Sequence, residues 1–288
     1  MDNLSSNKKY LVTGGSGFLA EGLLRYLTKH NIKNVVLLAR NEGNLIKMKQ
    51  QFPHVELVTG NCADPKIVYK ALDGVSGVFH LAAYKHVGLA EKYPLECIQS
   101  NVTASLTLLE CSLHKDIHLD FLIGISTDKA CQVNGVYGAT KYLMEKMFQD
   151  YEKINKDTKY RIVRYGNVLY STGSVLCKWK KLIEQGKEVI VTDPTATRFY
   201  WTVDQAIDLI MNCLEKATNS TPYIPEMKSV SIGNLLKAMI RKYANDKTIS
   251  VKTIGLQQGE NLHEQIQDNG PLSNQVEQYS IEEIMELI

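Results

Sequence analysis

Two short segments carry residue types suited to acid–base chemistry. Tyr137 and Lys141 stand four positions apart in Tyr-Gly-Ala-Thr-Lys, so a helix places both side chains on one face. An ammonium close to a phenol favours the phenolate, and we expect Lys141 to lower the pKa of Tyr137 from its usual value of about 10. Thr127 precedes Asp128 and Lys129, an acid beside a base. These five residues are candidate catalytic groups, and an exposed, salt-linked turn is the other interpretation of Asp128 and Lys129.

A glycine-rich turn near the start of the chain has the spacing of a phosphate-binding loop. Gly14 permits a tight turn, Gly17 lets an anion approach the backbone, and Ala20 allows a helix to pack closely on a strand. The turn follows a predicted strand and opens a predicted helix, which is the context that dinucleotide binding requires. A purely structural turn is the alternative. The residues expected to bind the dinucleotide here are Gly14, Ser16, Gly17, Phe18 and Leu19.

The second predicted strand ends at Arg40, where NAD-binding sites usually carry an acidic residue that binds the ribose hydroxyls. An arginine at this position would attract a 2′-phosphate, so we expect NADP. Glu42, two residues later, keeps NAD possible. A surface arginine without a ligand is the other interpretation of Arg40.

The elements that must position these residues alternate along the first half of the chain. Short apolar runs separated by helical patterns predict a parallel sheet buried on both faces, an α/β fold of the Rossmann-like doubly wound type. We expect residues 1–168 to form the NADP-binding domain, with 200–222 returning to it, and 169–288 to form a smaller, interleaved substrate-binding lobe. The predicted strands are 9–13, 34–39, 55–59, 77–81, 120–125 and 160–164, and the clearest helices are 17–29, 98–114, 137–154, 202–217 and 231–243.

Composition excludes several classes of protein. The chain has 288 residues, of which 44% are hydrophobic and 22% charged, with a net charge of +2, as in an ordinary globular protein. It has no charge block for nucleic acid, no apolar run of the ~20 residues a membrane span needs, and no signal segment at its start. We therefore expect a cytoplasmic protein without nucleic-acid or membrane partners. Six cysteines without a C-x-x-C pair predict free thiols and no metal site.

Longer motifs add a family resemblance. TGGSGFL, HLAA, YGATK and VRYGNV occur in this order, and the chain resembles the extended short-chain dehydrogenase/reductase superfamily over essentially its whole length. Within it, the chain resembles the inverting UDP-N-acetylglucosamine 4,6-dehydratases, which also act as 5-epimerases. The narrower resemblance rests on AAYKHVGLAEKYPLECIQSN, STDKA, GNVLYSTGSV, TRF and GENLHE. The Asp-Lys pair is its most informative part, because simple sugar 4-epimerases usually carry other residues there.

This resemblance implies a reaction and a role for each candidate. The sugar would be oxidised at C4, lose water across C5–C6, and take hydride back at C6. Tyr137 would take the 4-OH proton, with Lys141 beside it on the nicotinamide ribose, and Thr127 would bind the 4-oxygen. Lys129 would remove the C5 proton and a protonated Asp128 would donate to the departing 6-OH. Reprotonation from the opposite face would then invert C5.

The resemblance also assigns residues around the two ligands. Three departures from the family pattern concern the diphosphate, because Thr172 and Gln257 replace arginines and Asn261 replaces a lysine. Either Arg198 and a nearby lysine compensate, or the substrate differs. Further cofactor residues would be Asn61, Cys62, Leu81, Ala82, Ala83, Lys85 and Asn101, and the substrate residues His86, Thr127, Asn167, Thr192, Arg198 and Glu260.

Other functions remain open at this point. A UDP-sugar 4-epimerase or a retaining 4,6-dehydratase would use the same fold, and an NADP-sensing scaffold is the non-enzymatic alternative. The scaffold is disfavoured because the tyrosine–lysine pair is intact. Relatives assemble through the two helices that flank the active-site strand, here 98–114 and 137–154. We therefore expect a homodimer or a larger homo-oligomer that acts on a UDP-sugar.

Overall fold

The computed structural model describes residues 4–288, and a six-stranded parallel sheet forms its centre. All six predicted strands are present, so the predicted fold class, a Rossmann-like doubly wound α/β sheet, is confirmed. Chain order reverses between the first and fourth strands, which is where such sheets bind ligands. Across the sheet the strands follow the order β3 (Glu56–Thr59), β2 (Val35–Ala39), β1 (Lys9–Thr13), β4 (Val75–His80), β5 (Phe121–Thr127) and β6 (Lys159–Tyr165).

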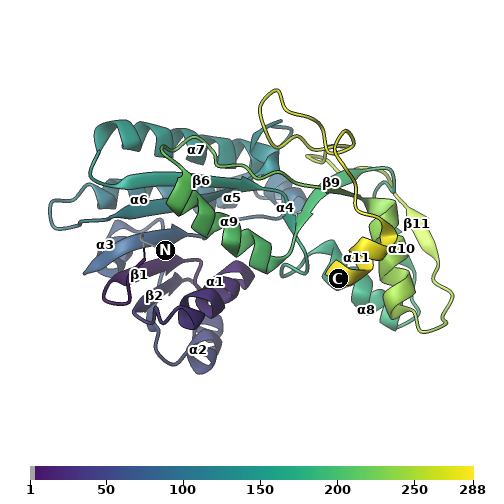
Figure 1. Ribbon diagram of the computed structural model, residues 1–288, viewed down its shortest axis with the longest axis horizontal. Helices are drawn as coiled ribbons and strands as arrows, with labels where there is room; N and C mark the ends of the chain where they lie inside the picture. The colour runs from purple at the N-terminus through teal and green to yellow at the C-terminus, as the bar shows by residue number, and fades with distance from the viewer. Residues whose placement is uncertain (1–3) are drawn as a thin grey trace.

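Helices cover both faces of this sheet (Figure 1). Side chains alternate along β1, so that Tyr10 and Val12 point into one apolar core and Leu11 into the other. The first core is closed by α1 (Phe18–Lys29), α2 (Glu42–Gln51) and α9 (Val203–Lys216), and the second by α3 (Pro65–Ala71), α6 (Ala104–Ser112) and α7 (Val136–Ile154).

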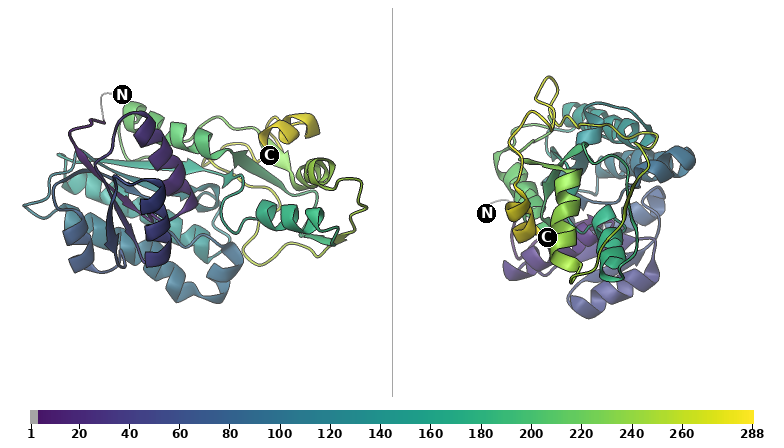
Figure 2. Two further views of the ribbon diagram at one scale, coloured as in Figure 1. Left: turned by 90° about the horizontal axis from the view of Figure 1, so that it is seen from below. Right: turned by 90° about the vertical axis from the view of Figure 1, so that its right-hand side faces the viewer.

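The second half of the chain builds a smaller lobe beside the carboxyl ends of the strands (Figures 1 and 2). Residues 203–216 nevertheless lie on the large sheet, because α9 packs against α1 and β6. The division into two domains stays a prediction. The lobe contains β7 (Asn167–Val168), α8 (Val175–Glu184), β8 (Val189–Val191), β9 (Thr197–Trp201), β10 (Ser229–Ser231), α10 (Ile232–Tyr243), β11 (Val251–Thr253) and α11 (Ile281–Leu287).

The predicted helix 98–114 is present, but it begins earlier and contains a π-helical turn. The chain forms α4 (Val87–Lys92) and α5 (Pro94–Ile98), then a π-helical segment, Gln99–Thr103, before α6. Asn101 lies in this segment, fully buried, and its side chain accepts from the Tyr84 amide at 2.7 Å and donates to the Tyr84 carbonyl at 2.9 Å. The π-helical turn thus contains the residue that holds the loop after β4, through two hydrogen bonds to Tyr84.

Between residues 4 and 288, no helix combines the length and the apolar character needed to cross a membrane. That the protein works in the cytoplasm stays a prediction.

Candidate active site

A cavity of about 500 Å³ joins the glycine-rich turn to the start of α7. It opens at the carboxyl ends of the central strands, between β1 and β4, where the order of the strands reverses. Asn101, which was also predicted to bind the cofactor, is not among the lining residues. Its side chain is hydrogen-bonded to the Tyr84 backbone instead. The other residues predicted to bind the cofactor all line the cavity: Gly14, Ser16, Gly17, Phe18, Leu19, Arg40, Asn61, Cys62, Leu81, Ala82, Ala83, Lys85, Tyr137 and Lys141.

The glycine-rich turn fits tightly against the neighbouring strand. Gly14 has φ +67°, and a Cβ on it would lie 2.7 Å from the amide nitrogen of Ala82. Gly17 is the N-cap of α1, and within the described chain no side chain caps this helix. Backbone N–H groups at the start of α1 therefore face the cavity, as a pyrophosphate requires. The cradle fits a dinucleotide.

Tyr137 and Lys141 lie on one face of α7 and both line the cavity. Burial raises the pKa of Tyr137 to about 12, and it lowers the pKa of Lys141 to about 8. The cation that opposes the shift of Tyr137 is Lys129. The expectation that Lys141 lowers the pKa of Tyr137 is therefore wrong for this structure: desolvation dominates, and the Lys141 ammonium is directed to Met144 Sδ at 3.4 Å.

Thr127, Asp128 and Lys129 continue from the end of β5 into a short 3-10 turn, Asp128–Ala130. Asp128 Oδ1 accepts from Thr127 Oγ1 at 2.8 Å and from Lys129 Nζ at 3.0 Å. Asp128 is 0% exposed, and its Oδ2 atom has no hydrogen-bond partner in the described chain. Burial raises the pKa of this carboxyl. An exposed salt-linked turn is therefore the wrong interpretation of the pair.

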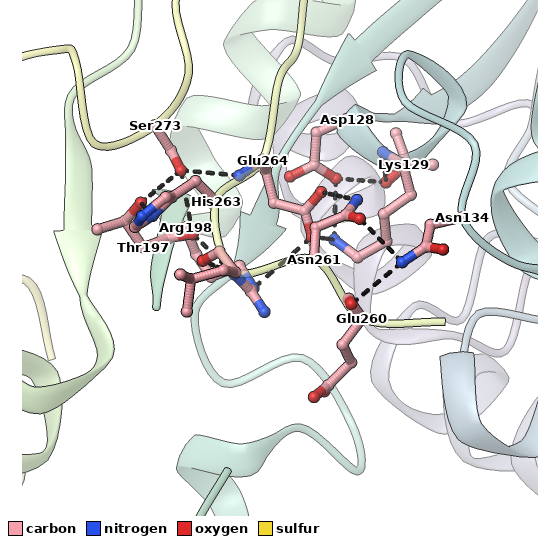
Figure 3. A network of polar contacts seen from close by, with 12 residues as sticks. Asp128, Lys129, Asn134, Thr197, Arg198, Glu260, Asn261, His263, Glu264 and Ser273 are labelled. Carbon is pink, nitrogen blue, oxygen red and sulfur yellow. Dashed lines mark hydrogen bonds and ion pairs between the residues drawn. The ribbon is translucent and has the colours of Figure 1, made fainter. Parts of the chain in front are cut away.

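A second carboxylate completes this group (Figure 3). Glu264 Oε1 lies 3.4 Å from Lys129 Nζ and 3.7 Å from Arg198 Nε. Although burial alone would lower the pKa of Lys129, Asp128 and Glu264 raise it above its usual value. Our sequence analysis assigned no role to Glu264. The only sequence cue was its position at the end of the GENLHE motif.

Arg198 lies on β9, is buried, and contacts neighbouring segments through its Nη1 and Nε atoms. Its Nη1 atom donates to the carbonyls of Thr197 at 2.8 Å and Leu262 at 3.0 Å, and its Nε faces Glu264. The cations that do line the cavity are Arg40, Lys85, Lys129 and Lys141. Arg198 is not among the residues that line the cavity, so the structure does not bring it to the predicted diphosphate site.

Of the remaining predicted substrate residues, Asn167 lines the cavity, whereas His86, Thr192 and Glu260 are not among its lining residues. The Oδ1 atom of Asn167 is buried without a hydrogen-bond partner in residues 4–288. His86 faces the loop at Gly173, where a Cβ would lie 2.9 Å from His86 Cε1. The Thr192 carbonyl accepts from the amide of Gly255 at 2.8 Å. Glu260 Oε2 accepts from the Gln257 amide at 3.1 Å, which closes a turn of the smaller lobe.

No group of three His, Cys, Asp or Glu side chains within the described residues is arranged to hold a metal ion.

Comparison with known proteins identifies a family and several relatives of this chain. Residues 10–287 match the model of a family described as polysaccharide biosynthesis protein. An uncharacterized membrane protein of Methanocaldococcus jannaschii is 33% identical over 275 residues, which cover 92% of this chain and 82% of the relative. The inverting UDP-N-acetylglucosamine 4,6-dehydratase of Campylobacter jejuni is 32% identical over 282 residues, covering 95% and 82%. A UDP-glucose 4-epimerase of Rickettsia massiliae is 30% identical over 268 residues, covering 90% and 77%.

Solved structures show the same fold. The X-ray structure of Pen from Bacillus thuringiensis superposes with a TM-score of 0.91 at 25% identity, covering 98% of this chain and 97% of that one. A dTDP-glucose 4,6-dehydratase of Streptomyces venezuelae, solved with NAD bound, gives a TM-score of 0.82 at 19% identity, covering 97% and 95%. These matches confirm the resemblance that the sequence motifs indicated.

Proposed function

The chain belongs to the polysaccharide biosynthesis protein family within the short-chain dehydrogenase/reductase superfamily, and from this premise we propose that it is a nucleotide-sugar 4,6-dehydratase that inverts C5. The proposed substrate is UDP-N-acetylglucosamine and the product UDP-2-acetamido-2,6-dideoxy-β-L-arabino-hex-4-ulose. The observation that carries the proposal is the buried Asp128–Lys129 pair beside Tyr137. A hydride-transfer site alone has no use for an acid and a base held in contact at 3.0 Å.

A nicotinamide dinucleotide, proposed here to be NADP, would occupy the large cavity. The free backbone amides in the first turn of α1 would hold the pyrophosphate, Lys141 the nicotinamide ribose, and Arg40 the 2′-phosphate. When bound, this cofactor accepts a hydride from sugar C4 and returns it to C6. Glu42 lies two residues after Arg40 and keeps NAD as the alternative.

The protein's own groups would carry the protons. Tyr137 takes the proton of the 4-OH as C4 becomes a ketone, while Thr127 binds the 4-oxygen. The ketone acidifies the C5 proton, because the resulting carbanion is an enolate. Lys129, as a neutral amine, takes this proton, and Asp128, as a neutral acid, gives its own to the 6-OH, which leaves as water. Protonation of C5 from the other face then inverts that centre.

A UDP-sugar 4-epimerase is the second candidate, and the epimerase relative at 30% identity is the observation that favours it. A 4-epimerase needs Tyr137 and reversible hydride transfer, with neither Asp128 nor Lys129 as a proton carrier. A retaining dehydratase would use the same pair but return the proton to the original face of C5. An NADP-sensing scaffold would leave every nucleotide sugar unchanged.

Association of two copies is also part of this proposal. Large apolar side chains are exposed along α5 and α7, whose residues lie in contact. Leu95 is 77% exposed and Leu143 48%, and both would be covered by a second copy. Light scattering at micromolar concentration should give a dimer or a larger closed assembly, and a monomer would contradict this part.

The test is proton NMR of the purified protein with UDP-N-acetylglucosamine in deuterated water. A C6 methyl signal, deuterium at C5 and an inverted C5 coupling pattern would support the proposed reaction. A methyl signal with the original C5 configuration indicates a retaining dehydratase, and a C4 epimer without a methyl indicates an epimerase. Lys129→Met and Asp128→Asn should abolish the methyl signal, whereas Lys146→Met, at an exposed lysine of α7, should retain it.

A further inference from the structure

Glu264 lies outside the helices and strands, but contacts to its backbone and its side chain hold it in place. It is 1% exposed, and Ser273 holds its backbone on both sides: the Glu264 amide donates to Ser273 Oγ at 2.9 Å, and the Ser273 amide donates to the Glu264 carbonyl at 2.7 Å. Glu264 Oε2 accepts from Asn261 Nδ2 at 3.2 Å. The smaller lobe thus inserts a fixed carboxylate beside Lys129, at the end of β5 (Figure 3).

The cluster of two carboxyl groups and two basic side chains at the end of β5 has zero net charge in two protonation states. Asp128 and Glu264 face Lys129 and Arg198, so the four charged forms sum to zero. Moving one proton from Lys129 to Asp128 leaves the sum at zero, with the Glu264–Arg198 pair unchanged. That second state has the neutral amine and the neutral acid with which the proposed elimination begins. The reaction then ends in the first state.

We propose that Glu264 is a positioning residue for the elimination: its buried carboxylate holds Lys129 Nζ against Asp128 and stabilises the ammonium that forms when Lys129 takes the C5 proton. This inference rests on the proposed function for its catalytic consequence, but the effect on Lys129 exists without substrate. In a buried site, a fixed anion 3.4 Å from the amine acts strongly on its charge. Arg198 keeps Glu264 itself ionised.

The neighbouring groups support this division of roles. Burial opposes ionisation of Glu264, but Lys129 and Arg198 hold the pKa of its carboxyl below the usual value. Tyr137 on α7 and Tyr200 on β9 also lie in the electrostatic field of Lys129. Burial raises the pKa of both phenols to about 12.

The experiment compares Glu264→Gln with Glu277→Gln, an exposed glutamate of the same lobe that pairs with Lys228. We expect Glu264→Gln to lower kcat about tenfold on the plateau above the acid limb of the kcat–pH profile, and to move that limb about one unit toward lower pH, since one pKa unit corresponds to a factor of ten. Glu277→Gln should change neither. A purely structural role would lower the amount of active protein and leave the limb where it is.

A second measurement needs no substrate. Reductive methylation with formaldehyde and cyanoborohydride acts on neutral amines, so its rate at Lys129, followed by peptide mass spectrometry and divided by the rate at Lys141, reports the proton affinity of Lys129. We expect about a tenfold faster relative rate in Glu264→Gln. If Glu264→Gln does not fold, Glu264→Asp, which keeps the charge but withdraws it, should give a smaller shift in the same direction.

The two proposals fail separately. A faster methylation rate in Glu264→Gln, together with a wild-type protein that makes no keto-sugar, would overturn the dehydratase and leave the role of Glu264 intact. A dehydratase whose methylation rate and acid limb are both unmoved by Glu264→Gln would overturn the inference about Glu264.

Discussion

Arg164 and Glu145 form a two-pronged ion pair beneath the active-site end of the sheet. Arg164 Nε lies 3.0 Å from Glu145 Oε1, and Nη2 lies 2.6 Å from Oε2, with both side chains almost fully buried. Glu145 also accepts from Ser126 Oγ, and Arg164 Nη1 donates to the carbonyl of Ile266 at 2.9 Å. The pair therefore ties β5, β6 and α7 to the segment that carries Glu264.

Removing one partner of this pair should destabilise the fold strongly. Glu145→Ala leaves the Arg164 guanidinium buried without its counterion, and we expect the free energy of unfolding to fall by about 3–5 kcal/mol. Urea unfolding followed by circular dichroism measures this. The double variant Glu145→Leu, Arg164→Met removes both charges and should recover most of the loss. A single variant within about 1 kcal/mol of wild type would show that water reaches Arg164.

His80 should make the protein acid-sensitive. Its ring is fully buried, with Nδ1 2.7 Å from Thr13 Oγ1 and Nε2 2.9 Å from Ser105 Oγ, and burial lowers its pKa to about 3. Below a pH of about 6.5 the unfolded chain therefore binds a proton that the folded chain does not. The free energy of unfolding should fall by about 1.4 kcal/mol for each pH unit between pH ~6 and pH ~3, and His80 should have no such effect above pH ~7.

The measurement is the difference in unfolding free energy between wild type and His80→Asn across this pH range. The difference should shrink as the pH falls, because only the wild type loses stability through this group. His118→Asn, at an exposed position, should give a difference that does not vary in this way. A constant difference for His80→Asn would mean that the ring takes up a proton in the folded state.

The sequence is informative about the sheet for a physical reason. Parallel strands buried on both faces are continuous apolar runs, and each of the six runs, such as the one around Leu37 in β2, forms a strand. The glycine-rich turn and the Tyr137–Lys141 spacing are equally local, because each depends on residues a few positions apart. Both line the cavity of the candidate active site.

The parts that sequence reasoning missed depend on contacts between distant segments. Glu264 meets Lys129 across 135 positions, and no periodicity encodes that meeting. Arg198 was expected at the diphosphate, yet it is held by Leu262 and Glu264 from the returning chain. Asn101, in the π-helical turn, is bonded to Tyr84, which lies 17 positions away on a loop of its own. Likewise, the effect of burial on Tyr137 exceeds that of its helical neighbour Lys141.

Substitutions at Gly14 and Gly74 allow the effect of backbone conformation to be separated from the effect of steric crowding. Both have φ +67°, but a Cβ at Gly14 would lie within 3 Å of the Ala82 backbone, whereas at Gly74 it would meet no heavy atom of the described chain within 4 Å. Gly74→Ala should therefore cost only the conformational strain, about 1 kcal/mol. Gly14→Ala should displace the turn and raise the dissociation constant of the dinucleotide by at least about tenfold. Thermal unfolding and cofactor titration test the pair, and equal behaviour would argue against a cradle at Gly14.

Arg40 should decide between the two nicotinamide dinucleotides. It is exposed at the cavity rim, so its contribution depends on a phosphate being there to meet it. A charge-assisted contact of about 1.5–3 kcal/mol predicts that Arg40→Ala raises the dissociation constant of NADP by roughly ten- to a hundredfold while changing that of NAD less than about twofold. Glu42→Gln is the matched comparison, since a carboxylate that served the ribose hydroxyls would make NAD the more affected ligand. Calorimetric titration of both dinucleotides against both variants measures this. Equal losses of NADP and NAD in Arg40→Ala would place the arginine on a part that the two share, and would remove the basis for assigning NADP.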